Sequence, residues 1–155
     1  MNSRHAGFTL IELLVVVALI AIASGVASLA LRDAASTRLE REAARLSALL
    51  EAARAEARAS GLAAYWEPLA AGNEEAQEAH FRFVGLPESS ELPEHWLEPG
   101  VAASVVGARA VVLGPEPLLP AQRIVLRLED RQLHLATDGL GPFAVTAEDA
   151  AGLQR

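Results

Sequence analysis

A single carboxylate stands at the start of a long apolar run near the beginning of the chain. Glu12 is followed by residues without charge from Leu13 to Leu31. A charged side chain within a membrane costs about 2.5–3.5 kcal/mol on insertion scales, so it normally has a partner of opposite charge. As a helix, the uncharged run would measure about 28 Å, enough to cross the apolar core of a bilayer. The sequence therefore points to charge pairing in apolar surroundings.

The residue types used in catalysis and metal binding do not form a recognisable group. The histidines are scattered, and no P-loop, Gly-x-Ser-x-Gly or His-x-x-His pattern occurs in the sequence. Asp138-Gly139 is interpreted as a turn, because the residues after it supply no side-chain oxygens for a cation. We expect a protein that is not an enzyme and that has no catalytic residues, metal or cofactor.

Composition narrows the class of partner. The chain has a formal net charge of −7, and the charges of Arg4 and Glu12 cancel, so the excess belongs to the part after the apolar run. An acidic body disfavours nucleic acid, whose binding depends on neutralising phosphates. The chain has no cysteine, which excludes disulfides and is compatible with any compartment.

The first residues resemble the class III signal of type IV prepilins and type II secretion pseudopilins. The shared features are a short basic leader, Gly7, the segment Phe8-Thr9-Leu10-Ile11-Glu12 and the apolar run. The resemblance implies that a prepilin peptidase cuts between Gly7 and Phe8 and methylates the amino group of Phe8. It also implies that Glu12 acts in assembly, where it meets the cationic terminus of a neighbouring subunit and offsets the cost of burying both charges.

Two other interpretations of the same segment compete with this one. An ordinary secretory signal has an apolar core of about 7–15 residues, which is shorter than the run seen here, and gains nothing from Glu12. A plain single-span anchor explains the run but not the Gly-Phe-Thr-Leu sequence. The flanking charges and the family together favour a cytoplasmic leader and an exported body.

The chain is predicted to have four parts. We expect a cleaved leader at 1–7, the transmembrane half of a helix at 8–31, its amphipathic periplasmic half at 32–60 and a periplasmic β body at 61–155. The second helical half has a narrow apolar seam with a period of three and four residues, formed by Leu39, Ala43, Leu46, Leu50, Ala53 and Ala57. The opposite face is interpreted as solvated, with Arg38, Arg41, Glu42, Arg45, Glu51, Arg54 and Arg58.

After Gly61 the pattern changes to short strands. A hairpin turning at Glu129–Arg131 is the clearest, because Ile124, Leu126 and Leu128 alternate onto one face. The other strands are expected at 62–66, 80–84, 101–106, 110–113 and 143–146, with irregular segments at 68–79 and 87–99. The fold class is therefore α+β and pilin-like: a long N-terminal helix packed on a small antiparallel β body of two sheets.

Three later segments resemble the carboxy-terminal region of the H-type minor pseudopilin of type II secretion, a family grouped with a minor pilin of type IV pili. They are Leu113–Pro117, Arg123–Leu126 and Thr137–Phe143. The resemblance implies a structural subunit in the bacterial inner membrane that joins the tip complex to the pseudopilus shaft for export of folded periplasmic proteins. Its implied partners are the prepilin peptidase, the I-, J- and K-type subunits, the major pseudopilin and the inner-membrane assembly platform.

Two further functions stay open at this point. One is a minor type IV pilin for pilus priming or DNA uptake, which would need an exposed arginine-rich patch. The other is a membrane-anchored enzyme or binding protein, which would need a catalytic cluster. The acidic segments Asn73–Glu78 and Pro87–Pro99 are candidate contact surfaces for partners.

Overall fold

The computed structural model describes residues 9–69, 79–87 and 89–146, and of residues 26–33 it describes the backbone alone. The chain forms two compact units, Met1–Ala34 and Ala35–Arg155, which are treated separately below. Helix α1, Leu10–Ser60, contributes its first part to one unit and its second part to the other. The described positions in the predicted cleavage segment begin at Thr9, so Gly7 and Phe8 lie outside the described residues.

The ends of α1 follow the usual capping rules. Thr9 precedes the first helical residue, and its Oγ1 accepts a hydrogen bond of 3.3 Å from the backbone N–H of Glu12, as an N-cap does. At the other end, Gly61 has a φ of +69°, the left-handed conformation in which helices commonly stop. The sequence prediction that the helix ends before Gly61 is confirmed.

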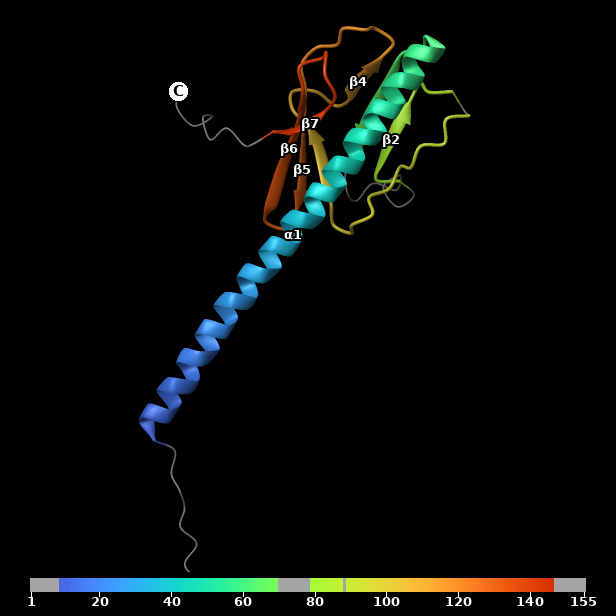
Figure 1. Cartoon of the computed structure of the whole chain (residues 1–155). Helices are drawn as coiled ribbons and strands as arrows, with labels where there is room; N and C mark the ends of the chain where they lie inside the picture. The colour runs from blue at the N-terminus through green and yellow to red at the C-terminus, as the bar shows by residue number, and fades with distance from the viewer. Residues whose placement is uncertain (1–8, 70–78, 88, 147–155) are drawn as a thin grey trace, which may run out of the picture. The chain divides into compact units, whose positions relative to one another are not determined.

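Seven strands build two antiparallel sheets in the second unit (Figure 1). The sheet of order β2-β1-β4 has three strands, and the sheet of order β3-β5-β6-β7 has four. The strands are β1 Ala64–Pro68, β2 Phe81–Val84, β3 Ala102–Val105, β4 Val111–Gly114, β5 Gln122–Leu128, β6 Arg131–Thr137 and β7 Ala144–Thr146. The expected fold class, a helix on a body of two antiparallel sheets, is confirmed; the first strand begins two residues later than predicted.

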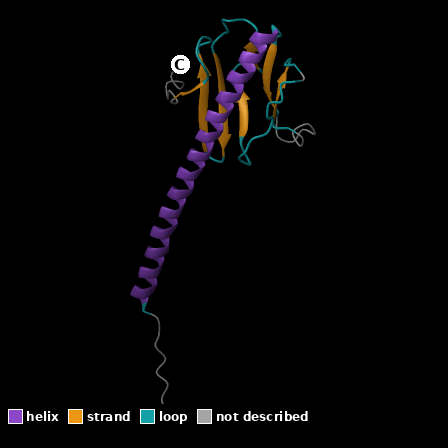
Figure 2. Ribbon diagram, turned by 45° about the vertical axis from the view of Figure 1, so that its right-hand side comes forward, coloured by secondary structure: helices purple, strands orange, loops and turns teal. Residues whose placement is uncertain are grey.

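The core lies between residues 35–60 of α1 and both sheets (Figure 2). Every residue of the predicted seam is at most 2 % exposed. The alanines of the seam bring the helix close to the strands, as at Ala57, whose Cβ would lie 3.0 Å from a Cβ added to Gly114. The core cluster joins the helix to large side chains of both sheets and of the loop before β7, namely Trp66, Phe81, Ile124, Leu126, Leu135 and Phe143.

Backbone groups at the free edges of two outer strands have hydrogen-bond partners from other segments. On β4, the Gln122 amide accepts a hydrogen bond of 2.7 Å from the Val112 N–H and donates one of 2.9 Å to the Val112 carbonyl. Along β2, the Glu94 carbonyl accepts from the N–H of Phe81 at 3.2 Å, and the Glu94 carboxylate accepts from the N–H of Phe83, also at 3.2 Å. At Val112, Phe81 and Phe83, the backbone groups on these outer edges are therefore not available to a further strand.

Candidate functional site

Glu12, the predicted assembly residue, lies in the first turn of α1. Its carboxylate is near the N-terminal end of the helix, where the helix dipole favours a negative charge. Thr9 and Glu12 also have the spacing of a capping box, although the structure gives only the bond from the Glu12 N–H to the Thr9 hydroxyl. The side chain of Glu12 is exposed, so it is accessible to another molecule.

The first part of α1 presents apolar side chains all round. Its large residues between Leu10 and Ile22 are 42–77 % exposed, which leaves no polar face in this part of the helix. A helix that is apolar all round requires burial against lipid or other protein. Within the part of the chain that the structure describes, no helical segment is both long and apolar enough to span a membrane.

In the second unit, the expectation that the charged face of the helix is solvated is wrong for Glu42. This carboxylate is 2 % exposed. Its Oε1 accepts hydrogen bonds from the backbone N–H groups of Leu97 and Glu98, at 2.7 and 2.9 Å. Its other oxygen lies 3.4 Å from Arg45. Glu42 is therefore buried because it is paired, and it attaches the irregular segment before β3 to the helix.

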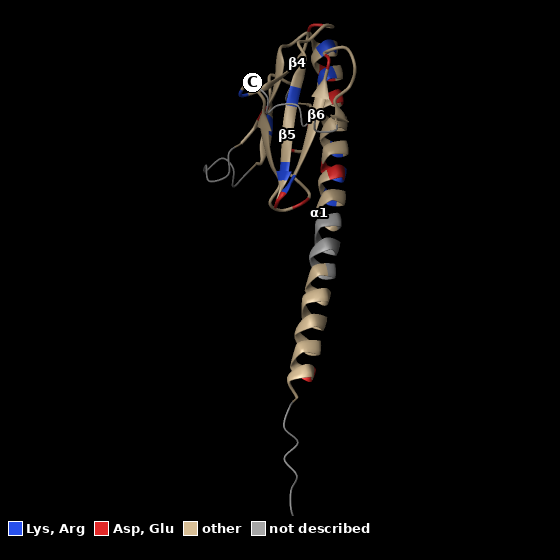
Figure 3. Ribbon diagram, turned by 90° about the vertical axis from the view of Figure 1, so that its left-hand side faces the viewer, with Lys and Arg blue, Asp and Glu red and all other residues tan. Residues whose placement is uncertain are grey.

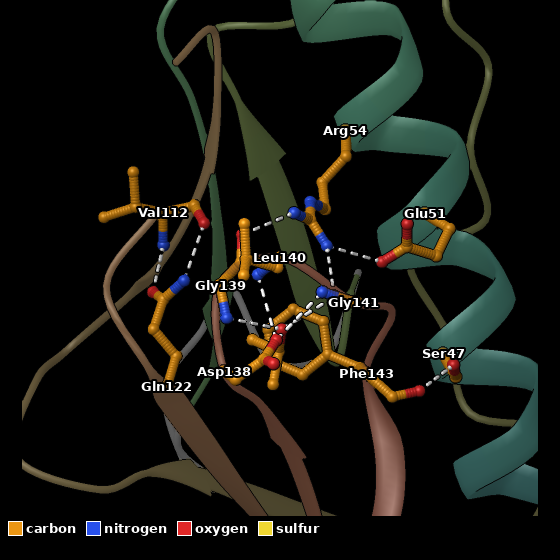
Figure 4. A network of polar contacts seen from close by, with 11 residues as sticks. Ser47, Glu51, Arg54, Val112, Gln122, Asp138, Gly139, Leu140, Gly141 and Phe143 are labelled. Carbon is orange, nitrogen blue, oxygen red and sulfur yellow. Dashed lines mark hydrogen bonds and ion pairs between the residues drawn. The ribbon is translucent and has the colours of Figure 1, made fainter. Parts of the chain in front are cut away.

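The same expectation is wrong for Arg54, which is 1 % exposed (Figure 4). Its guanidinium donates to the carbonyls of Gly141 and Gly139, at 2.9 and 3.3 Å. It also pairs with Glu51, three residues earlier on the helix, at 3.0 Å. Because the planar guanidinium has several N–H donors in a fixed geometry, it can bind two nearby carbonyls at once. Arg54 therefore holds the loop between β6 and β7 against the helix.

That loop has a tightly bonded turn of its own. Asp138 Oδ1 accepts from the N–H groups of Leu140 and Gly141, each at 2.9 Å. These backbone donors, that of Gly141 first, lower the pKa of Asp138 below its ordinary value of 3.8, and the charge of Arg54 lowers it further. The sequence interpretation of Asp138-Gly139 as a turn agrees with this geometry.

Close contacts fix the position of the loop between β6 and β7. Gly139 has a φ of +94°, and a Cβ at this position would overlap the carbonyl oxygen of Leu119. The hydroxyl of Ser47, on α1, donates to the carbonyl of Phe143, whose ring is 2 % exposed in the core. The loop is thus held from the helix, from the core and from the segment before β5.

The second acidic segment is only partly a solvated surface. Trp96 is 7 % exposed, and its ring centroid lies 4.5 Å from that of Phe81. The backbone N–H of Trp96 donates to His80 Nδ1 at 2.8 Å. Glu94 covers the edge of β2, and Glu98 lies 3.8 Å from Arg38. Of the described glutamates of this segment, Glu94 and Glu98 have partners within the body, whereas Glu91 is exposed. The other acidic segment, Asn73–Glu78, lies outside the described residues.

The described residues give no sign of a metal centre. No group of three or more histidine, cysteine, aspartate or glutamate side chains in 9–69, 79–87 and 89–146 is arranged to hold a metal ion. The polar networks found there join backbone groups of one segment to a side chain of another. Those of Glu42 and Arg54 hold loops of the body against the helix.

Comparison with known proteins identifies the start of the chain. Residues 2–28 match the family model described as the prokaryotic N-terminal methylation motif. The comparisons with curated proteins and with solved structures give no match. The match supports a type IV pilin-like or pseudopilin protein, a class of structural proteins that are usually anchored in the inner membrane through the N-terminal helix. It implies processing by a prepilin peptidase and assembly with other pilin-like subunits.

Proposed function

We propose that this protein is an H-type minor pseudopilin of type II secretion, which joins the tip complex to the shaft of the pseudopilus. In this role it would contact the I-, J- and K-type subunits on one side and the major pseudopilin on the other. The inner-membrane assembly platform would drive its incorporation, and the filament would act on folded periplasmic proteins. The subunit itself performs no chemical reaction.

The observation that carries the proposal is the N-terminal motif together with Glu12. The motif at residues 2–28 includes the Gly7–Phe8 bond at which we propose cleavage, followed by methylation of Phe8. Cleavage would leave a cationic amine four residues before Glu12 in the sequence. In a stack of subunits, that amine can pair with the Glu12 carboxylate of a neighbour, which offsets the cost of placing both charges among apolar side chains.

We place the chain in the inner membrane as a single-pass protein, with residues 8–31 in the bilayer and the body in the periplasm. The uncharged run from Leu13 to Leu31 supports this arrangement. Membrane insertion explains why the first part of α1 can expose large apolar side chains on all sides.

The H-type assignment is supported by features of the sequence and of the body. The loop at Thr137–Phe143, one of the segments that resemble the H type, is the loop that Arg54 holds to the helix. The apolar run has no proline near Leu29, where major subunits commonly carry one, and Glu12 argues against the K type. A minor type IV pilin, the alternative, shares the N-terminal features.

Processing and incorporation test the proposal in one strain. The wild-type protein should lose the mass of residues 1–7, gain one methyl group and be recovered with the tip subunits and the secretin-linked apparatus. Gly7→Val should leave the precursor uncut, because the peptidase needs close access to the backbone at that position; Gly25→Ala, in the apolar run, is the matched control. An uncut wild-type protein, or one recovered only with pili, would contradict the proposal.

A further inference from the structure

The outer face of the four-stranded sheet is basic although the protein is acidic. Arg123 and Arg127 lie on this face of β5, because the alternate residues Ile124, Leu126 and Leu128 point into the core. Both arginines are exposed. Figure 3 shows two blue stretches on the ribbon of β5 with a tan stretch between them. The chain as a whole has a net charge of −7.

Within the described strands β3, β5, β6 and β7, the register places no carboxylate on this face. Arg127 stands opposite Ala102 and Gln132, and Arg123 stands opposite Ala136. The middle row consists of Val125 with its register partners Ser104 and His134, followed on β7 by Thr146. The side chains of Arg123 and Arg127 have no hydrogen bond or ion pair among the described residues, whereas those of Arg38, Arg45 and Arg54 all do.

We infer that this face docks a carboxylate-bearing surface on the body of a different pilin-like subunit, an inference that rests on the proposed function. Charge complementarity carries the choice of partner. Two unpaired guanidinium groups on a flat sheet can each bind a carboxylate with two hydrogen bonds. Such pairs steer association and fix the register of two surfaces more than they add affinity.

The same charges disfavour other partners. A symmetric contact with a second copy of this face would place Arg123 and Arg127 against arginines, and like charges in contact disfavour association. Nucleic acid or an anionic membrane would meet only two cations on a protein with a net charge of −7. Neutralising about two phosphates gives only weak binding.

The first test is site-specific photo-crosslinking of the full-length protein in cells that assemble the filament. A photoreactive residue replaces Ser104, which is exposed on the edge strand β3 in the row of Val125. The control position is Glu116, which is exposed in the loop between β4 and β5. We expect Ser104 to crosslink to another subunit that carries the N-terminal methylation motif, at a segment rich in aspartate or glutamate. Crosslinking only to a second copy, only to nucleic acid or to nothing would overturn the inference.

The second test is charge reversal with a matched control. Arg123→Glu with Arg127→Glu should lower the yield of the crosslinked or co-purified complex about ten-fold or more, and Arg→Lys at both positions should keep most of it. Arg41→Glu with Arg58→Glu, on exposed helix positions, makes the same change in net charge and should have an effect of less than about two-fold. Equal losses in both double variants would overturn the inference.

A third measurement covers the case in which charge reversal disturbs folding. Raising the salt concentration from about 0.05 to about 0.5 M should weaken wild-type binding in detergent, because it screens exposed ion pairs. The milder double variant, Arg123→Gln with Arg127→Gln, should bind more weakly at low salt, and its affinity should change less with salt. A wild-type complex whose affinity does not change with salt would contradict the inference. If the protein is processed and incorporated but none of these changes matters, only the docking face is wrong. If it is neither processed nor incorporated, the proposed function itself fails.

Discussion

Glu42 accepts hydrogen bonds from two consecutive backbone N–H groups, those of Leu97 and Glu98, through a single carboxylate oxygen, at 2.7 and 2.9 Å. The carboxylate comes from α1 and the donors from the segment just before β3, more than fifty residues later in the chain. A buried charge with such donors is stable where a bare one would not be. Glu42 therefore serves as an anchor that holds an irregular segment in place.

Replacing Glu42 by alanine should lower the free energy of unfolding by about 2–3 kcal/mol, because two buried N–H groups lose a charged acceptor. Glu42→Gln keeps a carbonyl oxygen and should cost about 1 kcal/mol. Glu40→Ala, at an exposed position two residues away, is the matched control and should change stability by less than about 0.5 kcal/mol. Urea unfolding of the detergent-solubilised protein measures all three, and equal values for Glu42→Ala and Glu40→Ala would contradict the role of Glu42.

Arg54→Met should be destabilising by about 3 kcal/mol, since the carbonyls of Gly139 and Gly141 would lose their donors and Glu51 its partner. Arg54→Lys should recover part of the loss, because an ammonium group cannot reach both carbonyls as a fork. Arg58→Met, on the exposed last turn of α1, is the control. Proteolysis should show faster cutting of the loop between β6 and β7 in Arg54→Met, and unchanged protection of that loop would refute the assignment.

Gly139 and Gly107 both have a positive φ, so comparing their alanine variants distinguishes the cost of steric overlap from that of backbone strain. Gly139→Ala should cost about 3 kcal/mol or more, because its Cβ would overlap the Leu119 carbonyl in addition to the strain of a positive φ. Gly107 has a φ of +75° with nothing within 4 Å of an added Cβ, so Gly107→Ala should cost only about 1 kcal/mol. Thermal unfolding of the two variants gives the comparison, and a Gly107→Ala that is as damaging as Gly139→Ala would show that contact with Leu119 is unimportant.

Stability should depend on pH through Asp138. Its pKa in the folded protein is lower than its ordinary value of 3.8, so the stabilisation is present above that value and is lost as the pH falls through the folded pKa. The stability difference between wild type and Asp138→Ala should therefore be constant near neutral pH and shrink below about pH 3.8. Glu116→Ala removes an exposed carboxylate and should show no such change; a difference for Asp138→Ala that persists in acid would contradict the role of its backbone donors.

Assembly should depend on the charge of Glu12 and not on the helix cap. Glu12→Gln removes the charge, keeps the shape of the side chain and should reduce incorporation into the filament about ten-fold while processing stays normal. Thr9→Ala removes the hydroxyl that accepts from the Glu12 N–H and should cost about 1 kcal/mol of helix stability with little loss of incorporation. Quantitative mass spectrometry of isolated filaments measures both. The reverse order of effects would assign Glu12 a capping role.

The sequence was sufficient for the elements whose pattern is local. The seam from Leu39 to Ala57 and the β5–β6 hairpin both have strong periodicity, and both are found where they were predicted. Glu42 and Arg54 could not be recognised as buried, because their partners are main-chain groups that have no signature in the sequence. Each charged residue lies directly beside a seam alanine, Ala43 or Ala53, which is the one local sign that the buried stripe is wider than the apolar one.

Gln122 and Glu94 bind backbone groups at the outer edges of β4 and β2, which limits how this protein can pair with similar subunits. Backbone groups that already have hydrogen-bond partners cannot pair with a strand from another protein. When subunits are crowded together during filament growth, the three-stranded sheet would then not exchange or add strands at these positions. At these two edges, recognition by another subunit then depends on side chains, which can differ from one kind of subunit to the next, and not on main-chain pairing, which is unselective.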